Sequence, residues 1–482
     1  MGQRRHDSTR EGIIPSGSKL LRNVSSALAG RLAGALIGLL TFGVLARTIG
    51  AEGLGQYRTV LTMLLFAGVA FDFGLYTITL REISQPDGNS ARIVGNAVSL
   101  RIISTIASVL LLSLIVAAAG YGPTIRQGVL IAGVGWIGYQ LNDMLRAVFQ
   151  LKLAKHLGAL AETTGALVAL LLVIALSQLA AGTTAMLAAT AAGFIVTAAL
   201  AWTYAQRLVA FRPQIEWAIW RSLIVAGLPV AGSVLLLNIQ LRVDVLLLSI
   251  FHDARQVGLY DAPVKLYELL FVIPYLFGGL MMPLFVRDVG NGGGSFAPRL
   301  TAAISASVII SGLAFAVLFV HAESIVTVLA GPEFVASAVP LRILAAAAVF
   351  AGISAILRFA ATALNQAGAM LRVDVIGVSA ALFAHLLLIP PYGILGAAMG
   401  KLCGDVVTSA AAIIMMRRQL TPKVFASAFL AVAAAAVLAT ALSFASEAGV
   451  HWMVSTLLCG GGVAGALLLL PHVRKSLGYL SA

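Results

Sequence analysis

Long apolar segments separated by short polar breaks run through almost the whole chain. The breaks contain Gly, Pro or charged residues, and most of the segments are long enough for a bilayer-spanning helix, which needs about 20 residues. The pattern predicts an all-α polytopic membrane protein of about fourteen transmembrane helices. These are expected at approximately 24–46, 59–80, 93–118, 125–145, 158–177, 184–205, 219–248, 260–286, 300–320, 338–357, 373–390, 393–416, 424–445 and 452–471.

Composition excludes a water-soluble protein. Of the 482 residues, 60% are hydrophobic and only 11% are charged, and the mean hydropathy is +0.98. Soluble domains carry about 25% charged residues. No long exterior loop interrupts the pattern and no phosphate-binding G-x-x-x-x-G-K-[ST] motif is present, which argues against a receptor or an ATP-hydrolysing pump.

The distribution of Lys and Arg predicts the orientation. Most of them lie in the N-terminal segment and in every second break, whereas Arg47, Arg58, Arg126 and Arg255 fall in the loops of the opposite side. Cytoplasmic segments carry the excess of positive charge in membrane proteins. Both termini are therefore predicted to be cytoplasmic, and the net charge of +13 is mainly a signal of topology rather than of nucleic-acid binding.

Two short patterns recur in the same direction. Gly55-Gln56-Tyr57 recurs as Gly258-Leu259-Tyr260, and Leu145-Arg146 with Glu162 and Gly165 recurs as Leu357-Arg358 with Asp374 and Gly377. The recurrences predict two parallel six-helix repeats followed by two C-terminal helices, a design typical of alternating-access transporters. The expected divisions are a cytoplasmic basic segment 1–22, an N-terminal lobe 23–212, a C-terminal lobe 213–418, two further helices in 419–472 and a cytoplasmic tail 473–482.

Charged residues inside the predicted spans are the candidate functional groups, because each costs roughly 2.5–3.5 kcal/mol at bilayer depth. Asp261, Lys265 and Glu268 lie at i, i+4 and i+7 and so share one helix face. Four cations are predicted to line a hydrated cavity and bind an anionic headgroup: Arg31, Arg101, Arg242 and Lys265. Asp72, Asp244 and Glu268 are predicted to couple an ion or to pair with these cations.

The alternative is that these charges only neutralise one another. In that interpretation Lys265 pairs with Asp261 or Glu268, and Arg242 pairs with Asp72 or Asp244. No spacing typical of a metal site or a cofactor site is found, so none is predicted.

Two stretches carry a resemblance to a known family. They are Leu45–Tyr57, which reads LARTIGAEGLGQY, and Asp244 followed by VGLY at Val257–Tyr260 and KLYE at Lys265–Glu268. They resemble motifs of the polysaccharide-transporter branch of the multidrug/oligosaccharidyl-lipid/polysaccharide (MOP) exporter superfamily, which also has fourteen spans.

The resemblance implies a Wzx-type flippase of the bacterial inner membrane. Such a protein moves undecaprenyl-diphosphate-linked oligosaccharide to the periplasmic leaflet for O-antigen, capsule or exopolysaccharide assembly. Its implied partners are the lipid-linked sugar, membrane lipid, and a polymerase with assembly proteins, and it is not an enzyme. A cation-coupled multidrug exporter and a MurJ-type lipid II flippase are the nearest alternatives. A membrane-embedded glycosyltransferase and a non-transporting scaffold are more distant ones.

Overall fold

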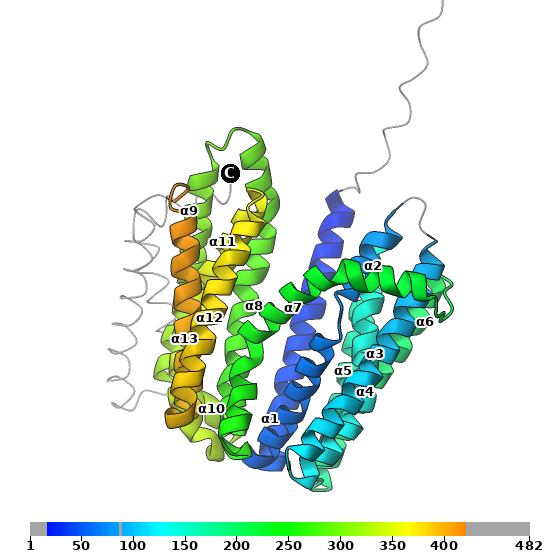
Figure 1. Cartoon of the computed structure of the whole chain (residues 1–482). Coiled ribbons are helices and arrows are strands. Elements are labelled where there is room, and N and C mark those ends of the chain that lie inside the picture. Colours follow the sequence, from blue (N-terminus) through cyan, green and yellow to red (C-terminus); the bar gives the residue numbers. More distant parts are fainter. Residues whose placement is uncertain (1–16, 86–88, 421–482) are drawn as a thin grey trace, which may run out of the picture.

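A computed structural model describes residues 17–85 and 89–420, and in these residues it consists of helices (Figure 1). The first group of helices is α1 (Gly17–Ala70), α2 (Leu75–Ile83), α3 (Ser90–Ala118), α4 (Pro123–Leu151), α5 (Lys155–Gln178) and α6 (Thr183–Leu208). Then follow α7 (Trp217–Phe251), α8 (Ala254–Gly290), α9 (Phe296–Val320), α10 (Ala322–Ala330), the 3₁₀ helix η1 (Pro332–Ser337), α11 (Ala338–Ala363), α12 (Ala367–Tyr392) and α13 (Ile394–Met415).

The predicted spans between 24 and 416 fall on helices, except that 59–80 is divided between α1 and α2. Ten helices of the described residues are long and apolar enough to cross a membrane. The first two spans are joined in α1, which changes direction at Gly50, where φ is 65°. The predicted spans 424–445 and 452–471, the tail 473–482 and most of the segment 1–22 lie outside the described residues.

Span 59–80 was predicted as one helix, but the structure divides it. The helix α1 ends at Ala70, and α2 begins at Leu75 after a break that contains Asp72. Phe73 and Gly74 have φ values of 51° and 61°, the left-handed region that a helix cannot continue through. Discontinuous helices in transporters are tolerated where neighbouring groups satisfy the freed backbone. The apolar pattern alone does not reveal this break.

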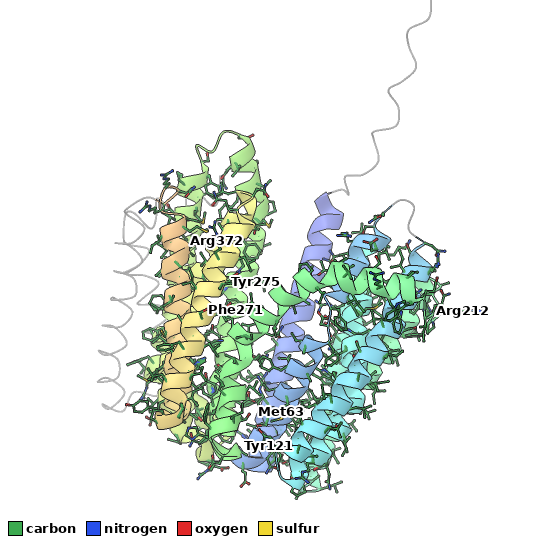
Figure 2. The ribbon with its side chains drawn as sticks, in the orientation of Figure 1. Met63, Tyr121, Arg212, Phe271, Tyr275 and Arg372 are labelled. Carbon is green, nitrogen blue, oxygen red and sulfur yellow. The ribbon has the colours of Figure 1, made fainter. Side chains whose placement is uncertain are left out.

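The helices form two lobes with α7 running between them (Figure 1). In the first lobe α4 and α5 pack on α6, and in the second lobe α11 packs on α8, α9 and α13. Met63 and Tyr121 of the first lobe line an apolar cavity of about 390 Å³ together with Leu246 and Ile250 of α7 (Figure 2). The C-terminal end of α7 therefore packs against the first lobe as well as against α12.

The lobes lie close together at one end and farther apart at the other (Figure 1). At the close end α1 contacts α8 through two glycines. A methyl group on Gly55 would lie 1.6 Å from Ala254 O, and one on Gly258 would lie 1.8 Å from Ala51 O. The contact is reciprocal, and only hydrogen at both positions lets the two backbones approach so closely.

The glycines of the recurring pattern, Gly165 and Gly377, make similar contacts in the two lobes. A methyl group on Gly165 would lie 1.9 Å from Thr197 Oγ1, and one on Gly377 would lie 1.9 Å from Thr408 Oγ1. The first of these contacts joins α5 to α6 and the second joins α12 to α13, both of them closely packed pairs. Small residues at helix interfaces allow this close packing in membrane proteins.

Candidate functional site

Five charged side chains from three helices meet where the two lobes face each other. We call them the inter-lobe cluster: Arg58 of α1, Arg242 of α7, and Asp261, Lys265 and Glu268 of α8. Asp261, Lys265 and Glu268 lie on one face of α8, as their spacing predicts. The cluster sits well inside the membrane-spanning region, because Arg58 is eight residues, or about 12 Å, from the end of the helix at Gly50.

Ion pairs connect the whole cluster. Arg58 Nε lies 2.8 Å from Asp261 Oδ1, and Arg58 Nη2 lies 3.6 Å from Glu268 Oε1. Glu268 also receives Arg242 Nη1 at 2.6 Å and Lys265 Nζ at 3.2 Å. Three cations thus share two carboxylates, which leaves one formal positive charge.

Exposure divides the cluster into a buried part and an accessible part. The side chains of Arg58 and Asp261 are 10% and 3% exposed, whereas those of Arg242 and Lys265 are 27% and 28% exposed. Arg58 and Asp261 therefore tie α1 to α8 across the lobes. Arg242 and Lys265 present donors that a ligand can reach.

The position of Arg58 differs from the sequence expectation, which placed it in an exterior loop. It is buried in α1 and carries a positive charge between the lobes. The expectation was wrong because the loop was assumed to extend past Gly55, whereas the helix resumes directly after Gly50. Counting charge by segments could not detect this, since the polar residues Glu52 and Gln56 beside the turn fit a loop as well as they fit a helix.

The other predicted residues lie elsewhere. Asp244 accepts a hydrogen bond from Tyr260 Oη at 2.9 Å and is 2% exposed. The charge-pairing interpretation expected Arg242 to pair with Asp72 or Asp244, but Arg242 pairs with Glu268. Its other expectation, that Lys265 pairs with Asp261 or Glu268, agrees with the contact of Lys265 with Glu268. Arg31 falls on α1, but its side chain lies outside the described residues.

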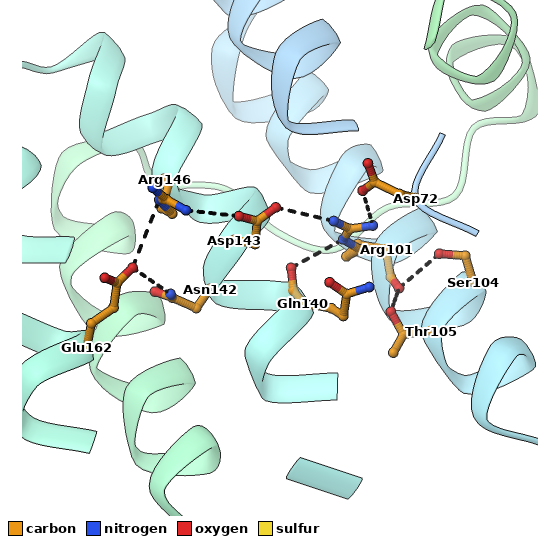
Figure 3. Close-up of polar contacts among 9 residues, drawn as sticks. All are labelled: Asp72, Arg101, Ser104, Thr105, Gln140, Asn142, Asp143, Arg146 and Glu162. Carbon is orange, nitrogen blue, oxygen red and sulfur yellow. Dashed lines mark hydrogen bonds and ion pairs between the residues drawn. The ribbon is translucent and has the colours of Figure 1, made fainter. Parts of the chain in front are cut away.

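Asp72 and Arg101 form a second centre in the first lobe (Figure 3). Arg101 Nη1 lies 2.5 Å from Asp72 Oδ1, and Nη2 lies 3.5 Å from Asp143 Oδ2. The Arg101 Nε–H donates to Gln140 O at 3.2 Å, and the residue is 1% exposed. Among the described residues, Arg101 shares no carboxylate with Arg242 or Lys265, so these three predicted cations do not belong to one ion-pair network. The role of Arg101 in substrate binding stays a prediction.

The second centre continues to residues that the sequence analysis did not select as functional. Arg146 Nη1 lies 3.1 Å from Asp143 Oδ1, and Arg146 Nε lies 3.9 Å from Glu162 Oε1. Asn142 Nδ2 donates to Glu162 Oε1 at 3.1 Å. The recurrence of Arg146 and Glu162 as Arg358 and Asp374 was the available signal.

The corresponding pair of the second lobe is also joined. Arg358 Nη1 and Nη2 lie 2.5 and 2.8 Å from the two carboxylate oxygens of Asp374. Within the described ranges no group of three or more His, Cys, Asp and Glu could hold a metal ion.

Comparisons with known proteins agree with this architecture. The model of the family described as "Polysaccharide biosynthesis protein" matches residues 20–287. A search of curated proteins finds no match.

Solved structures with the same fold are found. The lipid II flippase MurJ in an inward closed conformation aligns with a TM-score of 0.77 at 12% identity, over 93% of this chain and 98% of that one. An inward-facing multidrug resistance MATE family transporter of the MOP superfamily gives 0.67 at 14% identity, over 80% and 94%. A variant of the Vibrio cholerae MATE transporter VcmN gives 0.56 at 16% identity, over 85% and 98%. At these identities the likeness shows the fold.

Proposed function

Because the chain belongs to the polysaccharide biosynthesis protein family, we propose that it moves a polyprenyl-diphosphate-linked oligosaccharide from the cytoplasmic to the periplasmic leaflet of a bacterial inner membrane. The family match and the fold together confirm the predicted resemblance to the polysaccharide-transporter branch of the MOP superfamily. A flippase of this kind supplies oligosaccharide units for O-antigen, capsule or exopolysaccharide assembly.

The observation that carries the proposal is the surplus positive charge of the inter-lobe cluster. Arg242 and Lys265 are both bound to the single carboxylate of Glu268 and are both partly exposed. A diphosphate group arriving between the lobes offers these cations more anionic oxygens than Glu268 does. Arg is suited to such a group because its planar guanidinium binds two oxygens at once.

The arrangement explains how a charged headgroup crosses an apolar layer. An isolated charge in hydrocarbon is very costly, with Born estimates in the tens of kcal/mol. A headgroup that passes between the lobes exchanges water for charged side chains, while its polyprenyl chain stays in the bilayer. The two ends open in turn as the lobes rock against each other, and the contact of α1 with α8 parts when the close end opens. The proposal includes the predicted topology, which has fourteen spans, two parallel six-helix repeats and both termini in the cytoplasm.

The decisive experiment is mass spectrometry of the polyprenyl-linked intermediates in a strain that lacks the gene, beside a plasmid-complemented control. Accumulation of one diphosphate-linked oligosaccharide together with loss of its surface polymer is expected, and the accumulated species names the substrate. A lipid pool identical to that of the complemented strain contradicts the proposal.

The site is tested by complementation with Arg242→Ala and Lys265→Ala. Each removes one of the accessible cations, so surface polysaccharide should fall while the amount of protein in the membrane stays unchanged. Arg372→Ala is the matched control, because Arg372 is an exposed cation of the same lobe outside the cluster (Figure 2). Normal polymer levels in both cluster variants would remove the cluster from the transport path.

The fold favours two related functions strongly enough to be tested beside the first. A lipid II flippase is suggested by the likeness to MurJ, and in that case loss of the gene depletes periplasmic peptidoglycan precursor and blocks growth where no second flippase is present. A multidrug exporter is suggested by the likeness to MATE transporters. Its loss leaves lipid intermediates unchanged and raises sensitivity to cationic dyes.

A further inference from the structure

A lysine of the second lobe is buried inside the membrane-spanning region. Lys401 of α13 is 4% exposed, and among the described residues it takes part in no ion pair. Its ammonium group instead donates to two backbone oxygens of α7, Gln240 O at 2.6 Å and Leu241 O at 3.4 Å. A buried charge is costly unless other groups satisfy it, so these bonds account for its place in the fold. They join α13 to one turn of α7.

The same turn of α7 is held by a second buried group. Asp244 accepts a hydrogen bond from the backbone N–H of Val245 at 2.9 Å through Oδ1. Its other carboxylate oxygen, Oδ2, accepts the bond from Tyr260 Oη of α8 that was described above. Residues 240–245 of α7, which we call the held turn, are therefore bonded to α13 on one side and to α8 on the other.

Arg242 of the inter-lobe cluster belongs to the held turn. Residues two apart on a helix point about 200° apart, so Arg242 and Asp244 lie on nearly opposite sides of α7. The guanidinium of Arg242 lies 2.6 Å from Glu268 Oε1, and its side chain is 27% exposed. The buried side of the turn is thus bonded to neighbouring helices, while the other side presents Arg242 to the space between the lobes.

Helix α8 connects the buried side of the turn with the inter-lobe cluster. Tyr260 and Tyr267 are two turns apart on one face of α8, and both are buried. Tyr267 Oη donates to Asp405 Oδ2 at 2.8 Å, and the Tyr267 ring centroid lies 5.2 Å from Lys401 Nζ. Glu268 follows Tyr267 directly and bonds Arg242 on the neighbouring face. One helix therefore supports Lys401 from behind and binds Arg242 in front.

We propose that Lys401 is a positioning residue for substrate binding: by holding residues 240–245 of α7 against α13, it keeps Arg242 where a diphosphate group binds between the lobes. The inference rests on the proposed function, which assigns Arg242 to the diphosphate. Lys401 itself is buried and does not touch the substrate. Without its two hydrogen bonds the turn can shift or rotate, and a guanidinium binds two phosphate oxygens at once only when its plane is correctly oriented.

The proposal is tested by ligand binding to the purified full-length protein in detergent. The probes are radiolabelled farnesyl diphosphate and farnesol, which is the same isoprenoid without phosphate, in a scintillation proximity assay. Lys401→Met removes the donors and keeps a side chain of similar length. It should weaken the binding of farnesyl diphosphate roughly tenfold, which corresponds to about one hydrogen bond to a charged group. The binding of farnesol should stay unchanged. An equal loss for both probes indicates a merely structural role and overturns the proposal.

A second variant separates the lost donor from the lost charge. Lys401→Met removes the cation one turn away from the buried Asp405, whereas Lys401→Met combined with Asp405→Asn removes one charge of each sign. In this charge-balanced variant the Asn amide oxygen can still accept from Tyr267, and the same loss of farnesyl diphosphate binding is expected.

Ser409→Ala is the matched control on the same helix. Ser409 Oγ donates to Phe350 O of α11 at 2.6 Å, so this variant also loses a buried bond from α13 to the backbone of another helix, but the helix is not α7. Its affinity for farnesyl diphosphate should equal that of the wild type. A loss as large as that of the charge-balanced variant overturns the proposal.

A double-mutant cycle tests whether Lys401 acts through Arg242. In an Arg242→Ala background the charge-balanced change should weaken farnesyl diphosphate binding no further, because the group that Lys401 positions is absent. The same loss in both backgrounds, or full affinity in the charge-balanced variant alone, overturns the proposal. Full affinity in Arg242→Ala alone contradicts the proposed substrate site instead, so the two failures are distinguishable.

Amide hydrogen exchange without ligand measures the hold on α7 directly. Peptides that cover residues 240–246 should exchange faster in the charge-balanced variant than in the wild type or in Ser409→Ala, because local opening of the turn becomes easier. Equal exchange in all three proteins overturns the inference that Lys401 holds this turn, whatever the substrate is.

Discussion

Substitution of Gly55 by Ala should separate the two lobes at their close end. The added methyl group would lie 1.6 Å from Ala254 O, whereas ordinary contact begins at 3.4 Å. The backbones of α1 and α8 must therefore move apart by about 1.8 Å, the difference between these distances. The methyl carbon is held rigidly by the backbone of α1 and Ala254 O belongs to the backbone of α8, so no side-chain rotation relieves the overlap.

The separation is measured by pulsed electron paramagnetic resonance between spin labels on the two lobes. Gln127 and Val335 are exposed, one in each lobe, and can be replaced by cysteine after Cys403 and Cys459 are changed to Ser. Gly55→Ala should lengthen or broaden the distance distribution and lower the export of polysaccharide.

Gly38→Ala is the matched control on the same helix, because a methyl group there meets nothing within 4 Å. It should leave the distance unchanged and stabilise the helix slightly, since Ala is favoured over Gly in helices by about 1 kcal/mol. A distance distribution for Gly55→Ala that matches that of Gly38→Ala would refute the inference that these glycines hold the lobes together.

Two further predictions concern stability. Arg101→Met leaves the carboxylates of Asp72 and Asp143 without their buried cation. Breaking a buried ion pair in this way costs about 3–5 kcal/mol of stability, so the variant should unfold in detergent at a clearly lower temperature than the wild type. Outside the spans, hydrogen bonds from Arg92 and Asn96 lower the pKa of Glu216 from 4.5 to about 2. The stabilisation by Glu216 should thus be complete above pH 4.5 and be lost as the pH falls through about 2, and the difference in stability between wild type and Glu216→Gln should shrink in that window.

Apolar periodicity was sufficient to locate the helices. Apart from 59–80, which is divided, the predicted spans from 24–46 to 393–416 fall on single helices. A bilayer accepts only segments that satisfy their own backbone hydrogen bonds, which makes a long apolar run a reliable signal. The i, i+4, i+7 spacing was likewise sufficient to place Asp261, Lys265 and Glu268 on one face. Local spacing determines both results.

The break at Phe71–Gly74 could not be inferred in this way. Phe71 and Phe73 continue the apolar pattern, and the single Asp72 reads as a charge inside a span. The helix ends there because Arg101, brought from α3, pairs with Asp72, and because the backbone of Phe73 approaches the backbone at Gly227 of α7. Both partners are distant in the sequence.

By itself, then, the sequence determined the membrane class, the helical spans and the types of residue that carry charge into the bilayer. Only the tertiary structure decided which charges meet. It brought Arg58 to Asp261 and joined Asp143 to both Arg101 and Arg146. The physical reason is that an ion pair inside the membrane depends on distances of 3–4 Å between different helices. Those distances follow from helix packing and from close contacts such as that of Gly55 with Gly258, which no periodicity along one helix encodes.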